Sequence, residues 1–499
     1  MPLTKIVCTL GPATEDPEVI RAMIRAGMTV ARLNYSHGGW EEKQKAAATV
    51  RRLAQEEGRY VALMGDLQGP KIRVGALPKD GVTLVEGSEI VLVAGPVLAP
   101  QTEIPFPHPD IIDDIKCGDR VLLDDGNLEL LVTEAQATRL RCRVVVGGLL
   151  TSNKGVNLPG AALKIAALTD KDRDDALHAL RLGLDYIALS FVRRAADIEE
   201  LRAHLLAHID GGAERRVGED PNRVPGIVAK IEKPQALEQL ESIVAASDAV
   251  MVARGDLGVE IAAERVPLVQ KQIIRLCNRM GRPVITATQM LQSMIELPRP
   301  TRAEASDVAN AILDGSDAVM LSGETSVGRY PVESVQIMAR IAENVEASAD
   351  FPYNQLMELP TAGFEGNEDP EQISRAISRA TIVISACSAA TAILSLTESG
   401  RTARTVARHR PRVKLLGCTP FQSTARRLQL VWGVVPTLVG NFHDTDEMVV
   451  AMVRAATHAG YIHQGNNVVL TAGIPLDVHG VTNMVMVHTV RDVDLNGST

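Results

Sequence analysis

The sequence predicts a closed (β/α)8 barrel that is interrupted by a small β domain and followed by a separate α/β domain. Eight short apolar runs, most of them separated by stretches with helical spacing, begin near residues 5, 29, 60, 186, 226, 249, 283 and 317. Buried parallel strands of a barrel have this length and composition. Between about 74 and 156 the pattern changes to short alternating runs, and a new α/β rhythm begins at about 346.

The length of the chain requires more than one domain. At 499 residues it is too long for one hydrophobic core. We assign residues 1–69 and 160–345 to the barrel, residues 70–159 to the inserted β domain, and residues 346–499 to the C-terminal α/β domain.

The N-terminal part of the barrel has short connections between its predicted elements. Helical spacing predicts helices over 17–26 and 41–56, and β-rich runs predict strands over 5–10, 29–33 and 60–64. This β-α-β-α-β order is typical of a parallel α/β fold.

The inserted segment shows no long helical period. Turn residues separate its short alternating runs, and the proline-rich residues 96–109 predict a loop. The predicted strands of the insert are 82–85, 89–93, 120–123, 128–132 and 141–146.

The remaining elements alternate again between strand and helix, and residues 360–369 predict a linker. Helices are predicted over 170–182, 195–208, 234–246, 267–280, 303–314 and 370–386. Strands are predicted over 186–191, 226–229, 249–253, 284–287, 318–321, 392–396, 413–418, 434–438, 467–471 and 484–487.

Bulk composition excludes several functional classes. The formal net charge of −9 and the pI of about 5.7 argue against nucleic acid as the main partner. The six cysteines form no Cys-x-x-Cys pair and the N-terminus lacks a signal-peptide pattern, so we expect reduced thiols and a cytoplasmic location. The stretch 380–396 contains several serine and threonine residues, which predicts a buried helix and strand instead of a membrane span.

Residues 227–260 carry the clearest functional signal. Two apolar runs end in charged groups, the first at Glu232 and the second at Asp256. Carboxylates at the ends of neighbouring strands repel unless a cation lies between them, and Mg²⁺ or Mn²⁺ suits such oxygens. Lys230 precedes Glu232 by two residues, so both side chains point the same way. The pattern predicts a divalent metal site beside a lysine that stabilises a phosphoryl group or an enolate, with Gly255 admitting a ligand to backbone N–H groups.

The charged residues at these strand ends also have an ordinary interpretation. A salt-bridged strand end explains Lys230 or Glu232 equally well when either is taken singly. Arg32 and Arg73 are fork-shaped donors suited to phosphate, although a single arginine at a strand end is more often a surface ion pair.

Oxygen-bearing side chains follow several of the other predicted strands. Asn34, Ser36 and Asp66 could hold a cation or a phosphate. Thr288 or Ser322 alone is more often a helix N-cap. The concentration of such groups at successive strand ends nevertheless favours a site at the carboxyl end of the barrel.

A turn rich in hydroxyl groups and glycine, residues 397–402, follows a predicted strand of the C-terminal domain. With Arg401 and the nearby Arg404, Arg408 and Arg410 it is a candidate phosphate site. A solvated basic loop explains the same residues equally well.

Several motifs resemble those of the pyruvate kinase family. The matching segments are ARLNYSHG (31–38), KGVNLPG (154–160), VAKIEKP (228–234), MVARGDLGVEI (251–261), the long segment 287–325, and TESGRTARTVARHRPR (397–412). They occur in family order over nearly the whole chain. The resemblance implies a (β/α)8 barrel with a lid domain inserted after the third strand, and a C-terminal regulatory domain. It also implies phosphoryl transfer from phosphoenolpyruvate to ADP, giving pyruvate and ATP in the last step of glycolysis.

The resemblance implies roles for individual residues. Glu232 and Asp256 match the Mg²⁺ ligands, and Lys230 matches the lysine that stabilises the transferring phosphoryl group and the enolate. Residues that match groups around the substrate are Arg32, Gly255, Asp256, Thr288, Ser322 and Glu324. Residues that match nucleotide contacts are Arg73, Lys154, His37 and Asn34. Residues at the K⁺ position of the family are Asn34, Ser36, Asp66 and Leu67, the last through its carbonyl.

Two departures from the family pattern concern ions and regulation. K⁺-dependent members carry Thr, Lys and Glu where this chain has Leu67, Gln68 and Lys71. Because Lys71 brings a fixed positive charge to the place where K⁺ would compensate a glutamate, we expect activity without K⁺. The final effector loop, 472–480, contains no arginine, and its Asp477 would repel a second phosphate.

We therefore expect the allosteric activator to be AMP or a sugar monophosphate instead of fructose 1,6-bisphosphate. The residues expected to hold it are Thr397, Ser399, Gly400, Arg401 and Thr402. The family resemblance also implies a homotetramer.

Two other functions fit parts of the sequence. A metal-dependent lyase or aldolase acting on an enolpyruvate-like intermediate would use the barrel, the two carboxylates and Lys230, but would need neither the lid nor Arg73 and Lys154. A non-catalytic sensor that binds ligands through its C-terminal domain would tolerate loss of Lys230, Glu232 or Asp256, and all three are present.

Overall fold

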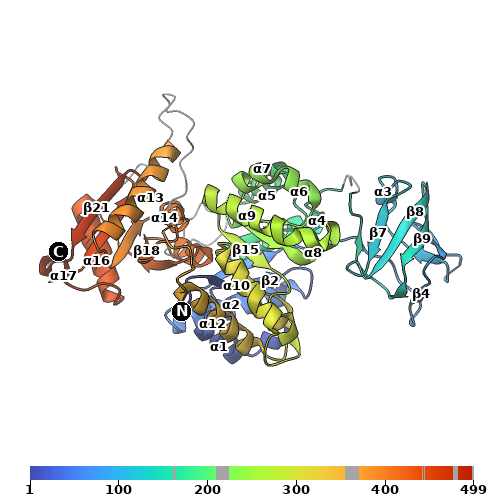
Figure 1. Ribbon diagram of the computed structural model, residues 1–499, viewed down its shortest axis with the longest axis horizontal. Coiled ribbons are helices and arrows are strands. Elements are labelled where there is room, and N and C mark those ends of the chain that lie inside the picture. The colour runs from blue at the N-terminus through green and yellow to red at the C-terminus, as the bar shows by residue number, and fades with distance from the viewer. Residues whose placement is uncertain are drawn as a thin grey trace.

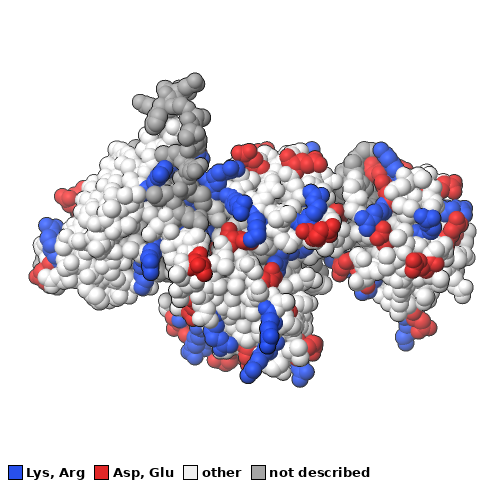
Figure 2. Space-filling model, viewed as in Figure 1, with Lys and Arg blue, Asp and Glu red and all other residues white. Residues whose placement is uncertain are grey.

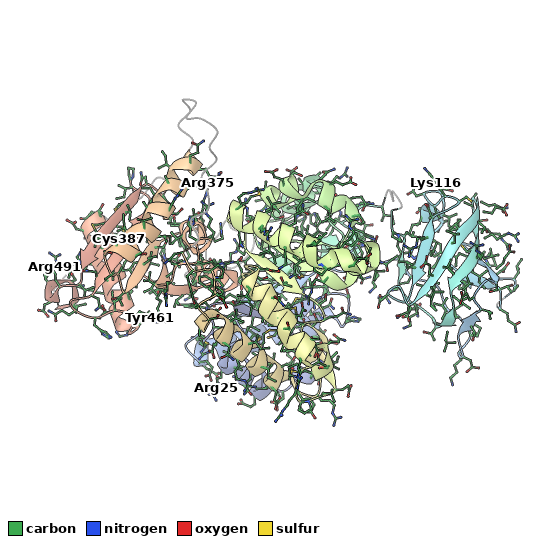
Figure 3. The ribbon with its side chains drawn as sticks, viewed as in Figure 1. Arg25, Lys116, Arg375, Cys387, Tyr461 and Arg491 are labelled. Carbon is green, nitrogen blue, oxygen red and sulfur yellow. The ribbon has the colours of Figure 1, made fainter. Side chains whose placement is uncertain are left out.

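The computed structural model describes residues 1–99, 101–160, 165–209, 224–354, 370–440, 442, 444–475 and 482–496. Three bodies lie in a row, with the barrel in the middle, the β insert on one side and the C-terminal domain on the other (Figure 1). Lys116 of the insert and Arg491 of the C-terminal domain mark opposite ends of the molecule (Figure 3). No helix among the described residues is both long and apolar enough to cross a bilayer.

The barrel is closed and all of its strand pairs are parallel, in the order β1-β16-β15-β14-β13-β12-β3-β2. This confirms the predicted (β/α)8 fold. The strands are β1 Lys5–Thr9, β2 Val30–Asn34, β3 Ala62–Asp66, β12 Tyr186–Leu189, β13 Gly226–Ile231, β14 Ala249–Ala253, β15 Val284–Ala287 and β16 Ala318–Leu321.

The helices of the barrel cover the outer face of this sheet (Figure 1). They are α1 Pro17–Ala26, α2 Trp40–Glu56, α4 Asp170–Arg181, α5 Ala195–Leu206, α6 Pro234–Glu238, α7 Leu240–Ala246, α8 Arg254–Glu260, α9 Val266–Met280, α10 Arg302–Leu313, α11 Gly323–Ser326 and α12 Pro331–Ala347. The prediction of one helix over 234–246 is wrong in one respect. The segment forms two helices, α6 and α7, because Gln239 between them has a φ of −117° and a ψ of 24°, which do not continue a helix.

Alternation along the strands decides which side chains reach the site. Ile6 and Cys8 pack outward against the helices, whereas Val7 and Val228 belong to the core inside the barrel. Because successive side chains of a strand point to opposite faces, the residues two and four positions after Val228 also point inward. These residues are Lys230 and Glu232.

The insert is a curled β domain with its own apolar core, as predicted. One sheet has the order β11-β7-β8-β9-β5-β6, and β10 pairs with β4. The strands are β4 Val82–Leu84, β5 Glu89–Val93, β6 Glu103–Pro105, β7 Arg120–Leu123, β8 Leu128–Gln136, β9 Arg139–Val146, β10 Gly148–Leu150 and β11 Val156–Asn157, with the short helix α3 Pro109–Ile112.

Strand β6 corrects the prediction of a plain loop over 96–109. Glu103 accepts hydrogen bonds from the backbone N–H groups of Leu98 and Ala99, at 2.5 and 3.0 Å, which folds the proline-rich segment back onto β5. On the face shown in Figure 2, Lys and Arg are interspersed with Asp and Glu over the insert.

The C-terminal domain is a mixed sheet in the order β19-β18-β17-β20-β21, in which only the β20–β21 pair is antiparallel among the described residues. Its strands are β17 Ala392–Leu396, β18 Lys414–Thr419, β19 Val434–Leu438, β20 Asn467–Ala472 and β21 Met484–Thr489. Its helices are α13 Pro370–Cys387, α14 Arg401–Ala407, α15 Gln422–Arg427, α16 Thr445–His458 and α17 Asp492–Asn496. Short 3-10 turns of the chain are η1 Pro12–Thr14, η2 Ala263–Arg265, η3 Gln292–Ile295 and η4 Leu428–Leu430. The predicted linker 360–369 lies outside the described residues.

The C-terminal domain closes the amino end of the barrel. Leu430 belongs to the apolar core inside the barrel, and the ammonium of Lys5 donates to the carbonyl of Val434 at 2.8 Å. The Asp317 carboxylate accepts from the backbone N–H of Trp432 and pairs with Arg410, both at 3.1 Å. The guanidinium of Arg410 also lies 4.8 Å from the centre of the Trp432 ring.

This docking explains two arginines that the sequence places beside the candidate phosphate turn. Arg410 is buried against Asp317, and Arg408 donates to the carbonyl of Arg279 at 3.2 Å. Both residues therefore contact the barrel and are not available to a phosphate at 397–402.

Candidate functional site

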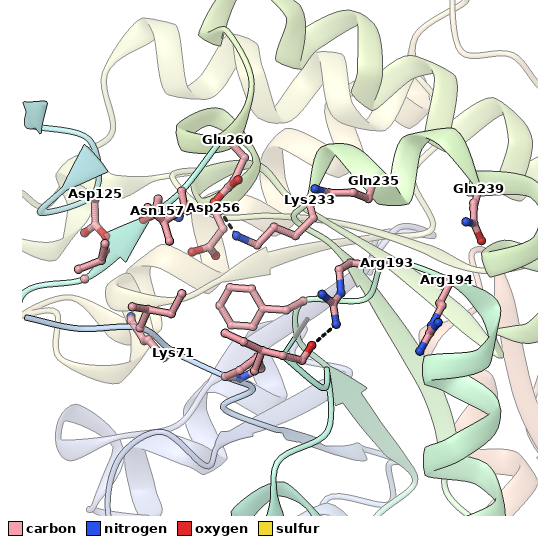
Figure 4. Close-up of a pocket in the computed structure, with 17 residues that line it drawn as sticks. Lys71, Asp125, Asn157, Arg193, Arg194, Lys233, Gln235, Gln239, Asp256 and Glu260 are labelled. Atoms are coloured by element: carbon pink, nitrogen blue, oxygen red, sulfur yellow. Dashed lines mark hydrogen bonds and ion pairs between the residues drawn. The ribbon is translucent and has the colours of Figure 1, made fainter. Parts of the chain in front are cut away.

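The carboxyl end of the barrel opens into a cavity of about 480 Å³ between the barrel and the insert. Residues from both bodies line it, and Figure 4 shows Lys71 and Asp125 of the insert side across from Lys233, with Asn157 of the insert next to Asp256 of the barrel. The ends of parallel strands and the loops that follow them face this cavity, which is where barrel enzymes place their chemistry.

A compact ion network lies at the ends of β2, β3 and β13. The ammonium of Lys230 is 3.2 Å from a carboxylate oxygen of Asp66, 3.0 Å from Glu232 and 2.7 Å from the hydroxyl of Ser190. The guanidinium of Arg32 pairs with the other oxygen of Asp66 at 2.6 Å and donates to the hydroxyl of Thr9 at 2.9 Å. The structure therefore brings together residues that lie more than 200 positions apart in the chain.

The network keeps Lys230 charged. Burial alone would lower the pKa of its ammonium, but attraction to Asp66 and Glu232 outweighs burial and raises the pKa above its ordinary value. Asp66 is buried too, and the nearby Lys230 and Arg32 outweigh that burial, so the pKa of its carboxyl is lowered. The site thus contains a fixed cation at a position where negative charge could develop.

Glu232 and Asp256 form a pair of carboxylates with unequal surroundings. Glu232 is buried, and its second oxygen accepts from the backbone N–H of Phe191 at 2.8 Å. Burial, together with repulsion from Asp256, raises the pKa of Glu232 despite the attraction of Lys230. The exposed carboxylate of Asp256 makes no hydrogen bond or ion pair with any described residue. Two hard oxygen donors that repel each other, one of them free, suit a divalent cation whose other ligands are water and substrate.

Thr288 lies beside Gly255 at the ends of neighbouring strands. Its hydroxyl accepts from the backbone N–H of Gly255 at 2.7 Å and donates to the carbonyl of Ala287 at 2.7 Å. Thr288 has a φ of +70°, which is unfavourable for a β-branched residue. The backbone holds this hydroxyl against the start of α8 at a cost in local energy, which is typical of functional positions.

Glu324 is fully buried and holds the backbone of its own turn and of one neighbouring loop. One carboxylate oxygen accepts from the N–H of Leu291 at 3.0 Å, and the other accepts from the N–H of Ser322 at 2.7 Å. Glu324 is therefore placed to position Ser322.

The loop after β2 is held by contacts within itself and with α2. The side-chain oxygen of Asn34 accepts from the N–H of Ser36 at 3.0 Å, and the carbonyl of exposed His37 accepts from Lys43 at 2.6 Å. The carbonyl of Leu67, also predicted for the K⁺ position, accepts from the hydroxyl of Ser190 at 2.7 Å.

Sequence reasoning missed the group of aromatic residues under this loop. The phenol of Tyr35 is 3.0 Å from Nδ1 of His178, and Trp40 stacks on the His178 ring with 4.8 Å between ring centres. The indole N–H of Trp40 donates to Asp175 at 2.7 Å. Tyr35 is adjacent to Asn34 and Ser36, but the distant His178 gives no local signal of this contact.

Arg73 and Lys154 do not reach the Lys230 network. Arg73 donates to the carbonyl of Asn153 at 3.1 Å, and Lys154 pairs with Asp124 at 2.6 Å. Both lie at the edge of the insert that faces the cavity, where Gly155 is a lining residue.

Glu260, which the sequence did not single out, ties the insert to the barrel. One of its oxygens accepts from Lys233 at 2.6 Å and from the amide of Asn157 at 2.9 Å. Figure 4 shows the contact between Glu260 and Lys233 beside Asp256. Because Lys233 follows Glu232 and Asn157 belongs to β11, this carboxylate links the segment after β13 to the insert.

The turn 397–402 is well formed. Gly400 has a φ of +81°, which glycine adopts without strain, and the hydroxyl of Thr402 is 2.9 Å from that of Thr482. Thr397 is buried, Arg401 lies 3.9 Å from Glu371, and the N–H of Arg401 donates to Ser399 at 3.4 Å. Residues 476–480 of the predicted effector loop, including Asp477, lie outside the described residues.

Comparisons with known proteins agree with this arrangement. Residues 1–335 match the family model described as pyruvate kinase, barrel domain, and residues 375–488 match the one described as pyruvate kinase, alpha/beta domain. The chain is 45% identical to pyruvate kinase 2 of Synechocystis sp. over 98% of this chain and 80% of that protein. It is 43% identical to the pyruvate kinase of Geobacillus stearothermophilus over 99% of this chain and 81% of that protein.

A solved structure is also similar over almost the full length. The crystal structure of a pyruvate kinase from Cryptosporidium parvum superposes with a TM-score of 0.88 at 32% identity, covering 98% of this chain and 96% of that chain.

Proposed function

Because this chain belongs to the pyruvate kinase family, and therefore transfers a phosphoryl group from phosphoenolpyruvate to ADP, we propose a residue-by-residue assignment of that reaction to the carboxyl end of its barrel. The lyase and sensor alternatives are set aside by the family. The observation that carries the assignment is a series of ion pairs of 3.2 Å or shorter, in which Arg32 and Lys230 both contact Asp66 and Lys230 also contacts Glu232.

Arg32 and Lys230 bind the phosphoryl group of phosphoenolpyruvate. Two fixed cations at the ends of neighbouring strands neutralise the charge of a phosphoryl group in transit, and phosphoryl transfer depends on positioning and charge more than on covalent chemistry. Lys230 also faces the enolate oxygen as its charge develops. The hydroxyl of Thr288 and the backbone N–H groups of Gly255 and Asp256 hold the substrate carboxylate, which would replace the hydrogen bonds that Thr288 now makes with Gly255 and Ala287.

Glu232 and Asp256 hold the Mg²⁺ that the family generally uses. When bound, this cation supplies positive charge to the phosphoryl and enolate oxygens. The free carboxylate of Asp256 and the raised pKa of Glu232 support the assignment, because both show negative charge that lacks a full complement of partners.

Arg73, Lys154, His37 and Asn34 bind the nucleotide. Arg73 and Lys154 are on the insert, so closure of the insert over the barrel would bring their charges to the phosphates of ADP and exclude water from the phosphoryl donor. The Glu260 contact to Asn157 supports this motion, since it provides a fixed point between the two bodies.

Ser322 positions the water that protonates the enolate, and Glu324 holds Ser322. The two backbone N–H groups bound by the buried Glu324 support a positioning role for this carboxylate.

The enzyme works without K⁺. Three of the four oxygen groups at the family's K⁺ position already have a partner in this chain. The Asn34 amide oxygen accepts from the N–H of Ser36, Asp66 pairs with Arg32 and Lys230, and the Leu67 carbonyl accepts from Ser190. Activity is to be assayed in tetramethylammonium buffer with and without KCl. Strong activation by KCl would refute this assignment.

The turn 397–402, which we call the effector turn, binds a monophosphate such as AMP or a sugar monophosphate. The hydroxyl and backbone groups of Thr397, Ser399, Gly400, Arg401 and Thr402 support this, with Arg401 as the exposed cation. Effectors titrated at sub-saturating phosphoenolpyruvate test it, and activation by fructose 1,6-bisphosphate alone would count against it.

The active enzyme is a homotetramer whose subunits have the domain limits 1–69 with 160–345, 70–159 and 346–499. The supporting observation is the family itself, and sedimentation equilibrium measures the subunit number. The reaction as a whole is tested by a coupled assay of ATP formation from phosphoenolpyruvate and ADP with Mg²⁺. Absence of ATP formation would contradict the function.

A further inference from the structure

A second cavity lies at the amino end of the barrel, far from the carboxyl-end site. Its volume is about 270 Å³. Tyr186 and Gly226, the first residues of β12 and β13, line it from the barrel, and Ser399 and Arg404 line it from the C-terminal domain. We call it the seam cavity, because both bodies contribute to its wall.

The seam cavity contains more positive than negative charge. Three guanidinium groups and one carboxylate line it, from Arg202, Arg404, Arg427 and Asp248. Asp248 is already engaged, since it pairs with Arg202 at 3.0 Å and accepts from the N–H of Ile227 at 2.9 Å. Within the described residues, neither Arg404 nor Arg427 has a carboxylate partner.

The two uncompensated arginines are nevertheless held in place. Arg427 donates to the carbonyl of Asp185 at 3.2 Å and to that of Val224, and its guanidinium lies 5.9 Å from the Tyr186 ring centre. Arg404 donates to the carbonyl of Ser399 at 3.3 Å, which is its single hydrogen bond with the described side chains and loops.

Arg404 shows the electrostatic consequence most clearly. Burial lowers the pKa of its guanidinium, and repulsion from Arg282 and Arg427 acts in the same direction against the attraction of Asp248. A half-buried cation with most of its five N–H donors unused is costly unless an anion joins it.

We propose that the seam cavity binds a small tetrahedral dianion, either inorganic phosphate or the phosphoryl end of a small phosphate monoester. Guanidinium groups match phosphate oxygens with paired hydrogen bonds. Sites for drug-sized ligands usually measure roughly 300–1,000 Å³, so a cavity of about 270 Å³ suits a small anion better than a nucleotide. The site goes beyond the effector turn proposed above and shares only Ser399 with it.

Occupancy links the two bodies. An anion between Arg202 of the barrel and Arg404 of the C-terminal domain adds hydrogen bonds across the seam, so it stabilises the docked arrangement by mass action. Phosphate should therefore raise the midpoint of thermal unfolding at constant ionic strength, and chloride should not.

The test is isothermal titration calorimetry of the full-length enzyme with inorganic phosphate, glycerol phosphate and AMP in chloride-matched buffer. Arg202→Gln and Arg404→Gln should each weaken phosphate binding about tenfold or more, since each removes a charged hydrogen-bond donor. Arg52→Gln removes an exposed arginine of α2 that pairs with Glu56, and should leave phosphate binding unchanged. ATP formation without phosphate should match wild type in all three variants.

Three outcomes would overturn the proposal. They are no saturable phosphate binding by wild type, equal phosphate binding by all three variants, and loss of phosphate binding in Thr402→Val but not in Arg202→Gln. The last outcome would place the anion at the effector turn alone. None of them bears on ATP formation, so a failed seam site remains distinguishable from a failed enzyme assignment.

Discussion

The two ends of the barrel each bury a lysine, and the two lysines have opposite properties. Lys230 at the carboxyl end lies within 3.2 Å of two carboxylates, and the pKa of its ammonium is raised. Lys5 at the amino end contacts the carbonyl of Val434 at 2.8 Å, and burial lowers its pKa to about 8 against the weaker attraction of Glu346 and Asp317.

The carboxylates at the two ends of the barrel differ in how completely they are paired. At the amino end the carboxylates are saturated with partners. Asp185, for example, accepts from Arg51 at 2.7 Å, from Arg426 at 2.9 Å and from the N–H of Leu63 at 2.8 Å. At the carboxyl end Asp256 has no partner among the described residues and Glu232 has a raised pKa. Incomplete pairing at the carboxyl end leaves negative charge at the place where we propose that the metal binds, and barrel enzymes place their active sites at this end.

The largest expected effect comes from removing the carboxyl-end lysine. Lys230→Met should lower kcat by about 10³-fold or more, because the fixed cation facing the phosphoryl group and the enolate is lost. Stopped-flow or coupled ATP assays measure this. Binding of Mn²⁺, followed by electron paramagnetic resonance, should persist because Glu232 and Asp256 remain. Near-normal turnover in Lys230→Met would contradict the proposed difference between the two ends. Lys5→Met is the matched control, and it should retain wild-type kcat.

The second effect concerns the saturated carboxylate at the amino end. Asp185→Asn should lower the free energy of unfolding by about 3 kcal/mol, since it removes the buried negative charge that pairs with Arg51 and Arg426. Urea denaturation followed by circular dichroism measures the change, and kcat should stay near wild type. The exposed Arg52→Gln is the control, with a change below about 1 kcal/mol. A strong loss of kcat in Asp185→Asn with an unchanged free energy of unfolding would contradict a purely structural role for Asp185.

A third effect depends on pH and on Lys5. Its folded-state pKa of about 8 lies below the ordinary value of 10.5, so the unfolded chain binds more protons between these values. Stability therefore rises with pH in that window, by about 2 kcal/mol between pH 8 and 10. Lys5→Met should lack this rise when its unfolding free energy is compared with wild type at each pH. Parallel curves for the two proteins would contradict the prediction.

The smallest effect compares two phenols, one at each end. Tyr35→Phe removes the contact with His178, and Tyr353→Phe removes a hydrogen bond of 2.8 Å to the carbonyl of Glu346. Each should cost about 1 kcal/mol of stability. Only Tyr35→Phe should also raise the KM for ADP, because only that loop carries Asn34 and His37. Equal KM values in both variants would show that the loop does not need its support.

The local sequence pattern predicted most helices and strands of the fold, and the elements that it missed have physical explanations. Strand β14 begins and ends at the predicted residues Ala249 and Ala253, because a buried run bounded by charge is a strong signal. Strand β6 was missed because Glu103 folds back a segment whose prolines indicate a loop. The break at Gln239 was missed because the apolar residues on either side of it keep the spacing of one continuous helix.

The candidate site was predictable where its residues end strands and less so where they act through distant partners. Lys230, Glu232 and Asp256 follow apolar runs directly, so the sequence alone brings them to one rim. The contacts of His178 and Glu260 depend on which helices become neighbours after folding, which period and composition do not encode. Arg410 was placed near a phosphate turn by its position in the chain, whereas the fold turns it toward Asp317.

The placement of the two tryptophans gives this enzyme a pair of built-in optical reporters. The chain has only Trp40 and Trp432, the first stacked on His178 beside the loop that follows β2 and the second buried under Arg410 where the C-terminal domain contacts the barrel. Trp40→Phe and Trp432→Phe would each leave a single fluorophore. Fluorescence of Trp40 in the Trp432→Phe variant would then report ligand binding at the carboxyl end of the barrel. Fluorescence of Trp432 in the Trp40→Phe variant would report structural change at the amino end.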